Sequence, residues 1–345
     1  MRLEILPVEG IGDITAGDDL AALITSAAPW LADGDVLVVT SKIVSKAEGR
    51  LVEVPADGPE RDEARVRALE SETARVVARR GPTTIVQTHH GFVMAAAGID
   101  ASNVDKTHLV LLPADPDASA RRLRADLAAR GLDVAVIISD TMGRAWRNGL
   151  TDVALGAAGI DALLDHRGEI DPYGNELNLT QMAVVDELSA AAELVKGKCD
   201  QVPVAVVRGY PIRRTGADAG VSVLIRDAES DMFGLGTAEA RAEGLREAAV
   251  LADATGPVAE LRAVERALRL VSEVLTPGTG IEMSARRGAV DSADAVRLTP
   301  AGSEPADFAR LGADAHRLRL ALATEGVISR VAFDDEGATL RFGEA

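Results

Sequence analysis

Short runs of Val, Ile, Leu and Ala, each bounded by polar or turn residues, limit the fold of this chain more than any other sequence feature. Runs of this length and composition are typical of β-strands. We expect strands at 35–40, 83–88, 92–98, 109–113, 134–139 and 202–209. Between them, apolar residues at three- and four-residue spacing predict helices at 17–31, 59–80, 117–131 and in the second half of 171–198. Strands mixed with helices indicate an α+β (mixed α/β) fold, and the sequence leaves open whether the sheet is doubly wound or two-layered.

The pattern of the chain changes after about residue 235. With 345 residues, the chain is long enough for about two domains. The tail predicts a helix at 261–275, a Gly- and Ser-rich loop at 276–293, and a terminal helix followed by a hairpin that turns at Glu336-Gly337. We therefore expect a first domain over 1–240 and a small C-terminal α+β extension over 241–345, in which we find no catalytic motif.

Charge and cysteine content argue against several classes of function. The chain has 37 Lys and Arg against 54 Asp and Glu, a net charge of −17. This balance argues against binding to nucleic acid, whose phosphates need clustered cations, and against docking on an anionic membrane. The single cysteine, Cys199, cannot form an internal disulfide. The chain does not begin with a basic segment followed by an apolar stretch, and its apolar runs are too short to cross a bilayer, so we expect a cytoplasmic protein.

Hydroxyl and cationic side chains follow the strand expected at 35–40. Thr40, Ser41 and Lys42 end that strand, and Lys46 comes after them. Such groups beyond the carboxyl end of a strand suit an anionic ligand, because open α/β sheets bind ligands there. A polar loop with solvated lysines explains the segment equally well. The segment is not a P-loop, because it lacks the Gly-rich cradle.

A second cluster follows the strand expected at 134–139. Asp140 and Thr141 come directly after it, and a Gly- and Arg-rich loop with Arg144 and Arg147 follows. A buried carboxylate is costly unless it is paired or binds a cation, and Asp and Thr oxygens are ligands that Mg²⁺ and Mn²⁺ prefer. The two arginines would neutralise a phosphate or a carboxylate. The alternative is a helix that begins at Asp140 or Thr141 and carries the arginines on its surface.

A third cluster follows the strand expected at 92–98. Asp100 and Asn103 come just after Gly98, which permits close approach of a ligand or another segment. Taken alone, this segment is typical of an Asx turn. Paired in space with Asp140, Asp100 would complete a two-carboxylate metal site.

Together, eight segments of the chain resemble the coenzyme F420:L-glutamate ligase family. They follow one another in order between about residues 3 and 240. The segments are ILPVEGIGDITAGDDL, DGDVLVVTSKIVSKAEGRLV, AAAGIDASNV, LLPADPDASA, ISDTMGRAWRNGLTDVALGAAGI, DPYGNELNLT, DELSAAAELVKGK and VPVAVVRGY. The resemblance implies an F420 gamma-glutamyl ligase-like α+β fold, assembled as a homodimer. It also implies a GTP-dependent enzyme that adds L-glutamate to the precursor coenzyme F420-0.

The resemblance further implies which residues form the site. Asp100, Asp140 and Thr141 would hold two divalent ions, Mg²⁺ or Mn²⁺, with K⁺ as a further ion. Lys46 and Arg144 would stabilise charge on the transferred phosphoryl group. The guanine nucleotide would contact Ile11, Gly12, Asp13, Ile14, Ser41, Lys46, Asn103, Leu194, Val195, Lys196, Gly197, Lys198, Cys199, Asp200 and Gln201. In some relatives, the stretch that corresponds to residues 194–201 contains an acidic or amide side chain that binds metal. The nearest residue of this chain to that position is Lys196.

In the reaction that the resemblance implies, the γ-phosphoryl group of GTP activates a carboxylate and the glutamate amine then displaces phosphate. This chemistry needs no enzyme nucleophile, in agreement with the lack of a Ser/His or Cys/His motif. The tail is too short for the flavin-binding, nitroreductase-like domain of two-domain relatives, so we do not expect FMN. Two other functions stay open: a metal-dependent nucleotide phosphohydrolase and a non-catalytic GTP-binding regulatory subunit.

Overall fold

The structure is a computed structural model that describes residues 2–102, 104–197, 200–215, 219–285 and 292–342. The chain is a mixed α+β protein, which confirms the predicted fold class. It divides into two compact units, Met1–Ala238 and Glu239–Ala345. Within the described ranges, no helix has both the length and the apolar composition needed to cross a bilayer.

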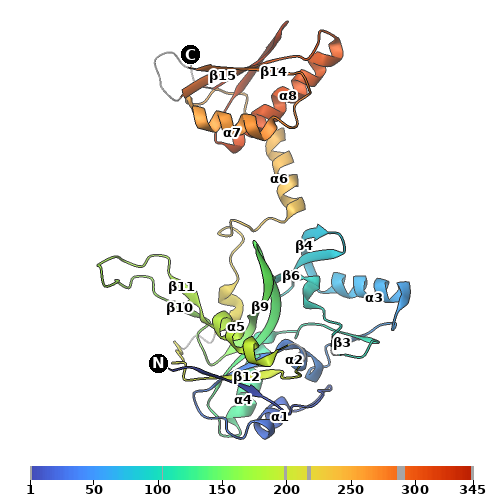
Figure 1. The fold of residues 1–345 in the computed structure, drawn as a ribbon, viewed down its shortest axis with the longest axis vertical. Helices are drawn as coiled ribbons and strands as arrows, with labels where there is room; N and C mark the ends of the chain where they lie inside the picture. The colour runs from blue at the N-terminus through green and yellow to red at the C-terminus, as the bar shows by residue number, and fades with distance from the viewer. Residues whose placement is uncertain (1, 103, 198–199, 216–218, 286–291, 343–345) are drawn as a thin grey trace. The chain divides into compact units, whose positions relative to one another are not determined.

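The first unit contains both strands and helices, mixed along the chain (Figure 1). Its strands are β1 (Glu4–Val8), β2 (Val36–Thr40), β3 (Leu51–Glu53), β4 (Thr73–Arg80), β5 (Thr83–Thr88), β6 (Val93–Ala95), β7 (His108–Val110), β8 (Ala135–Arg144), β9 (Arg147–Ala158), β10 (Leu163–Asp165), β11 (Gln181–Ala183) and β12 (Val204–Arg208). Its helices are α1 (Leu20–Ala27), α2 (Ser41–Ala47), α3 (Gly58–Ser71), α4 (Pro116–Ala128) and α5 (Val184–Lys196), with short 3₁₀ turns at Ala96–Gly98 and Gly220–Leu224.

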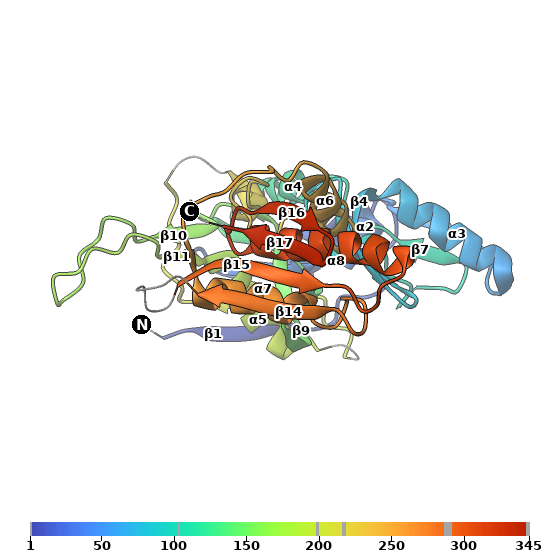
Figure 2. The ribbon, with the colours of Figure 1, turned by 90° about the horizontal axis from the view of Figure 1, so that it is seen from above.

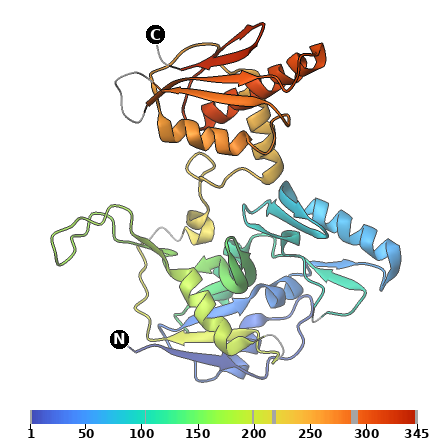
Figure 3. The same ribbon diagram turned by 45° about the horizontal axis from the view of Figure 1, so that its top comes forward.

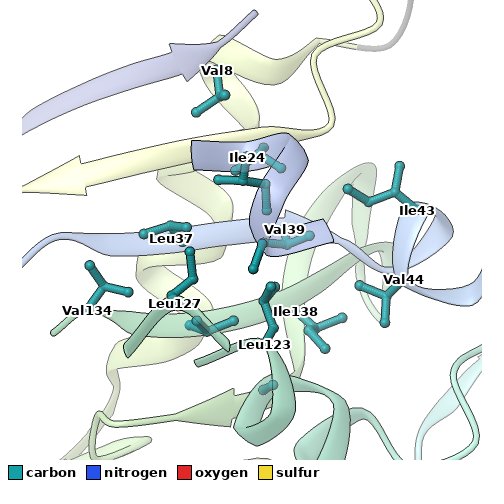
Figure 4. Close-up of a cluster of buried hydrophobic side chains, with 14 of the residues drawn as sticks. Val8, Ile24, Leu37, Val39, Ile43, Val44, Leu123, Leu127, Val134 and Ile138 are labelled. Atoms are coloured by element: carbon teal, nitrogen blue, oxygen red, sulfur yellow. The ribbon is translucent and has the colours of Figure 1, made fainter. Parts of the chain in front are cut away.

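A five-stranded sheet in the order β1-β12-β2-β8-β9 forms the centre of the first unit. β2 and β8 run parallel, and the other neighbours run antiparallel. Because successive side chains of a strand point to opposite faces, Leu37 and Val39 pack with residues of α1 and α4, whereas Val36 and Val38 pack with residues of α5. Figure 4 shows the first of these two clusters. Burial on both faces explains why these strands are continuously aliphatic.

The segment predicted as one long helix, 59–80, is a helix followed by a strand. The helix α3 ends at Ser71, and Thr73–Arg80 forms β4, which pairs with β5. The charges of this segment fit a solvated helix, but its β-branched residues fit a paired strand better. The strand predicted at 92–98 is also shorter: β6 ends at Ala95, because Ala96 and Ala97 have φ angles of 50° and 53° and turn the chain.

The segment after Asp140 is a hairpin, so both the predicted loop and the alternative helix are wrong. β8 continues to Arg144, β9 begins at Arg147, and Trp146 at the turn has a φ of 65°. β8 and β9 remain paired up to this turn, so the Gly- and Arg-rich segment is extended. A second extension, between β10 and β11, projects from the unit (Figure 3).

The second unit is a small α+β structure. Its elements are α6 (Thr237–Ala249, which begins just before the boundary), β13 (Ala259–Glu260), α7 (Leu261–Val271), β14 (Gly280–Ala285), β15 (Ser292–Thr299), α8 (Pro305–Thr324), β16 (Arg330–Asp334) and β17 (Gly337–Arg341). β15 pairs with β13, β14 and β17, and β17 also pairs with β16, which forms the far edge of the sheet (Figure 2). Leu298 and Leu340 of the sheet pack with Leu318 of α8 in its core.

Two details of the tail differ from the sequence prediction. Part of the loop expected at 276–293 forms β14, whose Ile281 and Met283 stand opposite Leu298 and Val296 of β15. The hairpin turns at Asp335-Glu336, one residue earlier than expected, because Asp334 pairs directly with Gly337. In both places the pairing between strands decides the conformation.

A buried carboxylate joins α8 to the segment that follows α7. Asp314 accepts hydrogen bonds from the backbone N–H of Thr276 (3.0 Å) and the hydroxyl of Thr279 (2.9 Å), and it pairs with Arg317 (2.7 Å). Burial opposes ionisation, but these bonds hold the pKa of Asp314 below its usual value.

We expect Asp314→Ala to destabilise the second unit by about 1–3 kcal/mol, because the partly buried N–H of Thr276 loses its acceptor. Since the folded-state pKa is lowered, the stabilisation by Asp314 should be present above about pH 3.8 and be lost as the pH falls through the folded-state pKa. Urea unfolding of both proteins at neutral and acidic pH measures this difference. An equal gap between them at every pH would contradict the assignment.

Candidate functional site

The site begins where the parallel pairing of β2 with β8 ends. In the register of β2 and β8, Thr40 stands opposite Ser139, so the next residues, Ser41 and Asp140, emerge together. The Ser41 hydroxyl donates a hydrogen bond to Oδ2 of Asp140 at 2.9 Å. Carboxyl ends of adjacent parallel strands are a common position for ligand sites in open sheets. The sequence predicted the end of β2 correctly, whereas β8 continues past Asp140 to Arg144, and the parallel register brings Ser41 and Asp140 together.

Asp140 carries a buried carboxyl group whose charge is poorly compensated. Burial raises its pKa, and the nearby carboxylates Asp152 and Asp100 raise it further, against the opposing hydrogen bonds from Ser41 and the Thr141 N–H. No Lys or Arg in the described part of the chain forms an ion pair with it. Each oxygen therefore keeps lone-pair capacity for a cation or for a proton.

Asp152 lies on β9 opposite Thr141 and belongs to a dense polar network. It accepts hydrogen bonds from the hydroxyls of Thr141 (2.7 Å) and Ser139 (3.0 Å) and forms an ion pair with Lys196 (2.9 Å). Burial works against its charge, but Lys196 and the two hydroxyls hold the pKa of Asp152 below its usual value. Asp152 is thus ionised and its oxygens are engaged, unlike those of Asp140.

Asp100, a second carboxylate near Asp140, forms an ion pair with a lysine. Lys42, on α2, pairs with Oδ2 of Asp100 at 2.6 Å and also donates to the hydroxyl of Ser102. Burial again opposes the charge, but Lys42 and the Ser102 N–H lower the pKa of Asp100. The position of Asp100 close to Asp140 agrees with the predicted pairing of the two carboxylates.

A pocket opens over these groups and is lined by several separate segments of the first unit. Its lining residues are Ile11, Gly12, Asp13, Ile14, Thr40, Ser41, Lys42, Ile43, Lys46, Gly98, Asp100, Val110, Leu111, Leu112, Asp140, Thr141, Asp152, Glu193, Gly197, Gln201, Val202 and Pro203. The predicted residues among them are Ile11, Gly12, Asp13, Ile14, Ser41, Lys46, Asp100, Asp140, Thr141, Gly197 and Gln201. The fold therefore gathers most of the predicted site around one pocket.

Several predicted residues do not line this pocket. Leu194, Val195, Lys196 and Asp200 are outside its lining, and so is Arg144. Arg144 lies at the tip of the β8–β9 hairpin, where its guanidinium group donates to the carbonyl oxygen of Asn148. Asn103, Lys198 and Cys199 lie outside the described residues. The roles assigned to all these residues stay predictions.

The sequence analysis missed two acidic residues of the pocket, Asp152 and Glu193. Asp152 becomes visible only when residues 134–158 are read as a hairpin, because the hairpin register places it opposite Thr141. Glu193 precedes Lys196 by three residues on α5, and the two side chains pair at 3.3 Å. Spacing of three residues on a helix is a recognisable signal for such a pair.

The charge of the pocket favours cations. Five carboxylates line it (Asp13, Asp100, Asp140, Asp152 and Glu193) against two ammonium groups (Lys42 and Lys46). Among the described residues, no three Asp, Glu, His or Cys side chains converge to hold a metal ion by themselves. Mg²⁺ is usually held by one or two carboxylates together with water and substrate phosphates. Asp140 with Asp100 fits that kind of site, which a phosphate-bearing ligand would complete.

Comparisons with known proteins agree on one family. The model of the family described as F420-0:Gamma-glutamyl ligase matches residues 10–209. The chain is 42% identical over 250 residues to the coenzyme F420:L-glutamate ligase of Methanothermobacter thermautotrophicus, covering 68% of this chain and 99% of that protein. It is 40% identical over 248 residues to the enzyme of the same name from Methanopyrus kandleri, covering 68% and 97% of the two chains. It is 42% identical over 241 residues to that of Halobacterium salinarum, covering 65% and 92%.

Proposed function

This chain belongs to the F420-0:gamma-glutamyl ligase family, and on that basis we propose that it joins L-glutamate to coenzyme F420-0 through an amide bond, with GTP as the phosphoryl donor. The reaction would release GDP and phosphate. The alignment to the coenzyme F420:L-glutamate ligase of Methanothermobacter thermautotrophicus covers nearly the whole length of that relative. The family match ends at residue 209, within the first unit. We therefore assign the proposed activity to the first unit.

The observation that supports this proposal most is the convergence of distant segments on one pocket. The segment 11–14, the start of α2 and the middle of β8 all line it, although they are far apart in sequence. A ligase for two carboxylate-bearing substrates and a triphosphate must bind several anionic groups close together. Lys42 and Lys46 supply positive charge from α2, while Asp100 and Asp140 supply oxygen ligands.

The proposed chemistry has two steps. A carboxylate oxygen of coenzyme F420-0 attacks the γ-phosphorus of GTP, and the bond to the β–γ bridging oxygen breaks, so that GDP leaves and an acyl phosphate forms. The amine of L-glutamate then attacks the acyl carbon, loses a proton and expels phosphate, which leaves an amide. Neither step needs an enzyme nucleophile, so positioning and charge stabilisation carry the catalysis.

Residues of this chain would orient the reacting groups and offset their charge. Ser41 holds the Asp140 carboxylate from the side of α2, and Thr141 fixes it through its backbone N–H. Lys46 lines the same wall of the pocket and is our candidate for contact with the transferred phosphoryl group. Divalent ions bound at Asp100 and Asp140 would supply Lewis-acid stabilisation of phosphate oxygens.

We assign nucleotide binding to two further segments of the pocket lining. These are Ile11, Gly12, Asp13 and Ile14 near the start of the chain, and Gly197 and Gln201 after α5. Gly197 has a φ of 64°, which residues with a side chain rarely adopt, so a glycine favours the turn of the chain after α5. The homodimer implied by the resemblance stays a prediction.

Mass spectrometry of the complete reaction tests the proposal. With full-length protein, coenzyme F420-0, L-glutamate, GTP and Mn²⁺, we expect a product heavier by one or more glutamyl units and one GDP for each amide formed. Excess EDTA should abolish both products, because the pocket lacks enough fixed cations to bind a triphosphate and two carboxylates.

Two other outcomes would replace the proposal. GDP formed without glutamate or coenzyme F420-0, and with no amide product, would identify a nucleotide phosphohydrolase. Unchanged GTP with every substrate present, in a protein that binds GTP, would indicate a regulatory subunit. Mass spectrometry of the complete reaction and of reactions without glutamate or coenzyme F420-0, together with a GTP-binding measurement, separates these outcomes.

A further inference from the structure

The tip of the β8–β9 hairpin carries an exposed aromatic pair. The ring centroids of Trp146 and Phe233 lie 6.2 Å apart, with their planes at 59°. Trp146 is 88% exposed and Phe233 is 69% exposed, although large aromatic side chains are highly buried on average. The two rings contact each other and still leave apolar faces that a flat ligand can cover.

The backbone conformation of Trp146 points to a role for its side chain. Its φ of 65° lies in the left-handed region, which bulky residues rarely adopt and which glycine adopts at no steric cost. The ring is exposed, so its burial does not offset this strain. Strained residues of this kind cluster at active sites and ligand-binding segments.

Two arginines flank the tryptophan at the same turn. Arg144 and Arg147 stand opposite each other in the register of β8 with β9, and both are exposed. Like charges directly opposite each other on paired strands are destabilising. An anionic group between them would offset this repulsion, and guanidinium groups suit phosphate oxygens. The hairpin tip thus combines aromatic faces with positive charge.

Phe233 is held in place by the segment that precedes α6. Arg75 of β4 donates a hydrogen bond to the carbonyl oxygen of Gly234 at 2.7 Å. The chain then passes so close to β4 that a Cβ on Gly236 would lie 2.4 Å from the carbonyl oxygen of Val77. β4 and β6 belong to the same three-stranded sheet. That sheet therefore positions the ring of Phe233.

The face of β8 that carries Asp140 is turned toward the same three-stranded sheet. Met142 follows Asp140 by two residues and so shares its face of β8, and it packs against the cluster that contains Met94 of β6. Trp146 comes six residues after Asp140, a separation of at most about 20 Å along an extended strand. A ligand that spans this distance must be long, with its reacting group and its ring at opposite ends.

We propose that Trp146 and Phe233 stack on the flat ring system of coenzyme F420-0 while its carboxylate reacts near Asp140. This substrate is a deazaflavin in which a phosphate-bearing chain joins the ring system to the reacting carboxylate. Arg144 and Arg147 neutralise that phosphate. The inference rests on the proposed function and deepens it, because it names the residues that select the acceptor substrate.

Calorimetric titration of coenzyme F420-0 into the full-length protein tests the inference, with Mn²⁺ and GDP present so that no phosphoryl group is transferred. Trp146→Ala and Phe233→Ala should each raise the dissociation constant about tenfold, a loss typical of a stacked base. Trp146→Phe keeps an aromatic ring and should bind within about threefold of the wild type. Phe333→Ala is the matched control, because Phe333 is an exposed residue of β16 in the second unit, and it should bind like the wild type.

Trp146→Gly separates binding from folding. This variant should bind coenzyme F420-0 as weakly as Trp146→Ala does, but it should melt no lower than the wild type, because glycine adopts a φ of 65° without strain. A lower melting temperature would assign the ring a structural role. A change of oligomeric state in analytical ultracentrifugation would assign it to an interface between copies of the chain. Either result would overturn the inference.

A separate titration with GTP distinguishes the two flat rings that the reaction brings together. If Trp146→Ala weakens the binding of GTP and not that of coenzyme F420-0, the aromatic pair holds the guanine ring and the inference is wrong. Unchanged dissociation constants in the folded variants, with amide formation by the wild type, would refute the inference alone. A wild-type protein that neither binds coenzyme F420-0 nor forms the amide would refute the proposed function as well, so the two failures are distinguishable.

Discussion

Asp140→Asn should lower the rate of amide formation by about 10³-fold, the largest loss of activity expected from a single substitution in this chain. Asp140 is the buried carboxylate at the centre of the pocket, and it has no cationic partner among the described residues. Asparagine has nearly the same shape but only one acceptor oxygen and no charge. A divalent ion and the phosphates that it binds would therefore lose their principal anchor.

The same substitution should leave the fold intact. Burial already raises the pKa of Asp140, so the folded protein gains little from its negative charge. In Asp140→Asn, the amide oxygen can accept from the Thr141 N–H and the amide nitrogen can donate to the Ser41 hydroxyl, because a hydroxyl group both donates and accepts. We expect a melting temperature within about 4 °C of the wild type, the shift that about 1 kcal/mol produces in a domain of this size.

Product formation, Mn²⁺ binding and melting temperature should be measured on the same preparations. Asp126→Asn is the matched control, because Asp126 is an exposed residue of α4 outside the pocket lining and the chemical change is identical. The control should keep wild-type kinetics. Wild-type amide formation by a folded Asp140→Asn protein would refute the role of Asp140 and remove the basis for a metal site at this strand end.

The position of Asp140 illustrates what the sequence alone could predict. An aliphatic run that ends abruptly in a carboxylate indicates a buried strand with a functional end, and the run ending in Thr40 and Ser41 gives the same signal. Two strand ends of this kind are compatible with one site, but only the parallel pairing of β2 with β8 brings them together. Local pattern predicts elements, and long-range pairing decides which of them meet.

The network around Lys196 could not be predicted for the same reason. A lysine in the last turn of a helix is favourable for a solvated helix end, so its sequence position points to the surface. Its burial depends on Asp152, which lies on another element and becomes a partner only through the β8–β9 hairpin. The sequence analysis treated the region between these strands as a loop, and it therefore missed the acid that holds the lysine.

The strand β4 shows a different source of error. Residues 59–80 are rich in charge throughout, and the β-branched residues Thr73, Val76 and Val77 are only a weak local sign of the change after Ser71. β4 forms because β5 offers a partner and β6 completes the sheet. Tertiary pairing outweighs helical propensity here, since propensity differences amount to only about 0.7 kcal/mol per residue for ordinary residues.

Gly156→Ala should destabilise the first unit by about 3 kcal/mol, because a single methyl group has no room there. A Cβ on Gly156 would lie 2.3 Å from the carbonyl carbon and oxygen of Pro116 and 2.8 Å from the backbone nitrogen of Asp117. These are backbone atoms at the first turn of α4, so no flexible side chain can move aside. The clash would push α4 away from β9.

The contact at Gly156 also fixes neighbouring backbone groups. Oδ1 of Asp117 accepts hydrogen bonds from the N–H groups of Ala157 and Val221, both at 2.9 Å, so the start of α4 joins β9 to the 3₁₀ turn at Gly220–Leu224. Displacing α4 would lengthen these bonds in addition to the steric cost. β9 carries Asp152 four residues earlier, so the pocket should lose its geometry before the unit unfolds.

Thermal unfolding of Gly156→Ala should therefore occur about 6–12 °C below that of the wild type. Gly143→Ala is the matched control, because it makes the same substitution in the same hairpin, where a Cβ would meet only Leu150 Cδ2 at 4.0 Å. That control should melt within about 2 °C of the wild type. Equal melting temperatures for Gly156→Ala and Gly143→Ala would contradict the close approach of α4 to β9. A selective loss at Gly156 would instead show that a glycine is required there by the backbone of a neighbouring helix, since its own φ angle is one that other residues adopt.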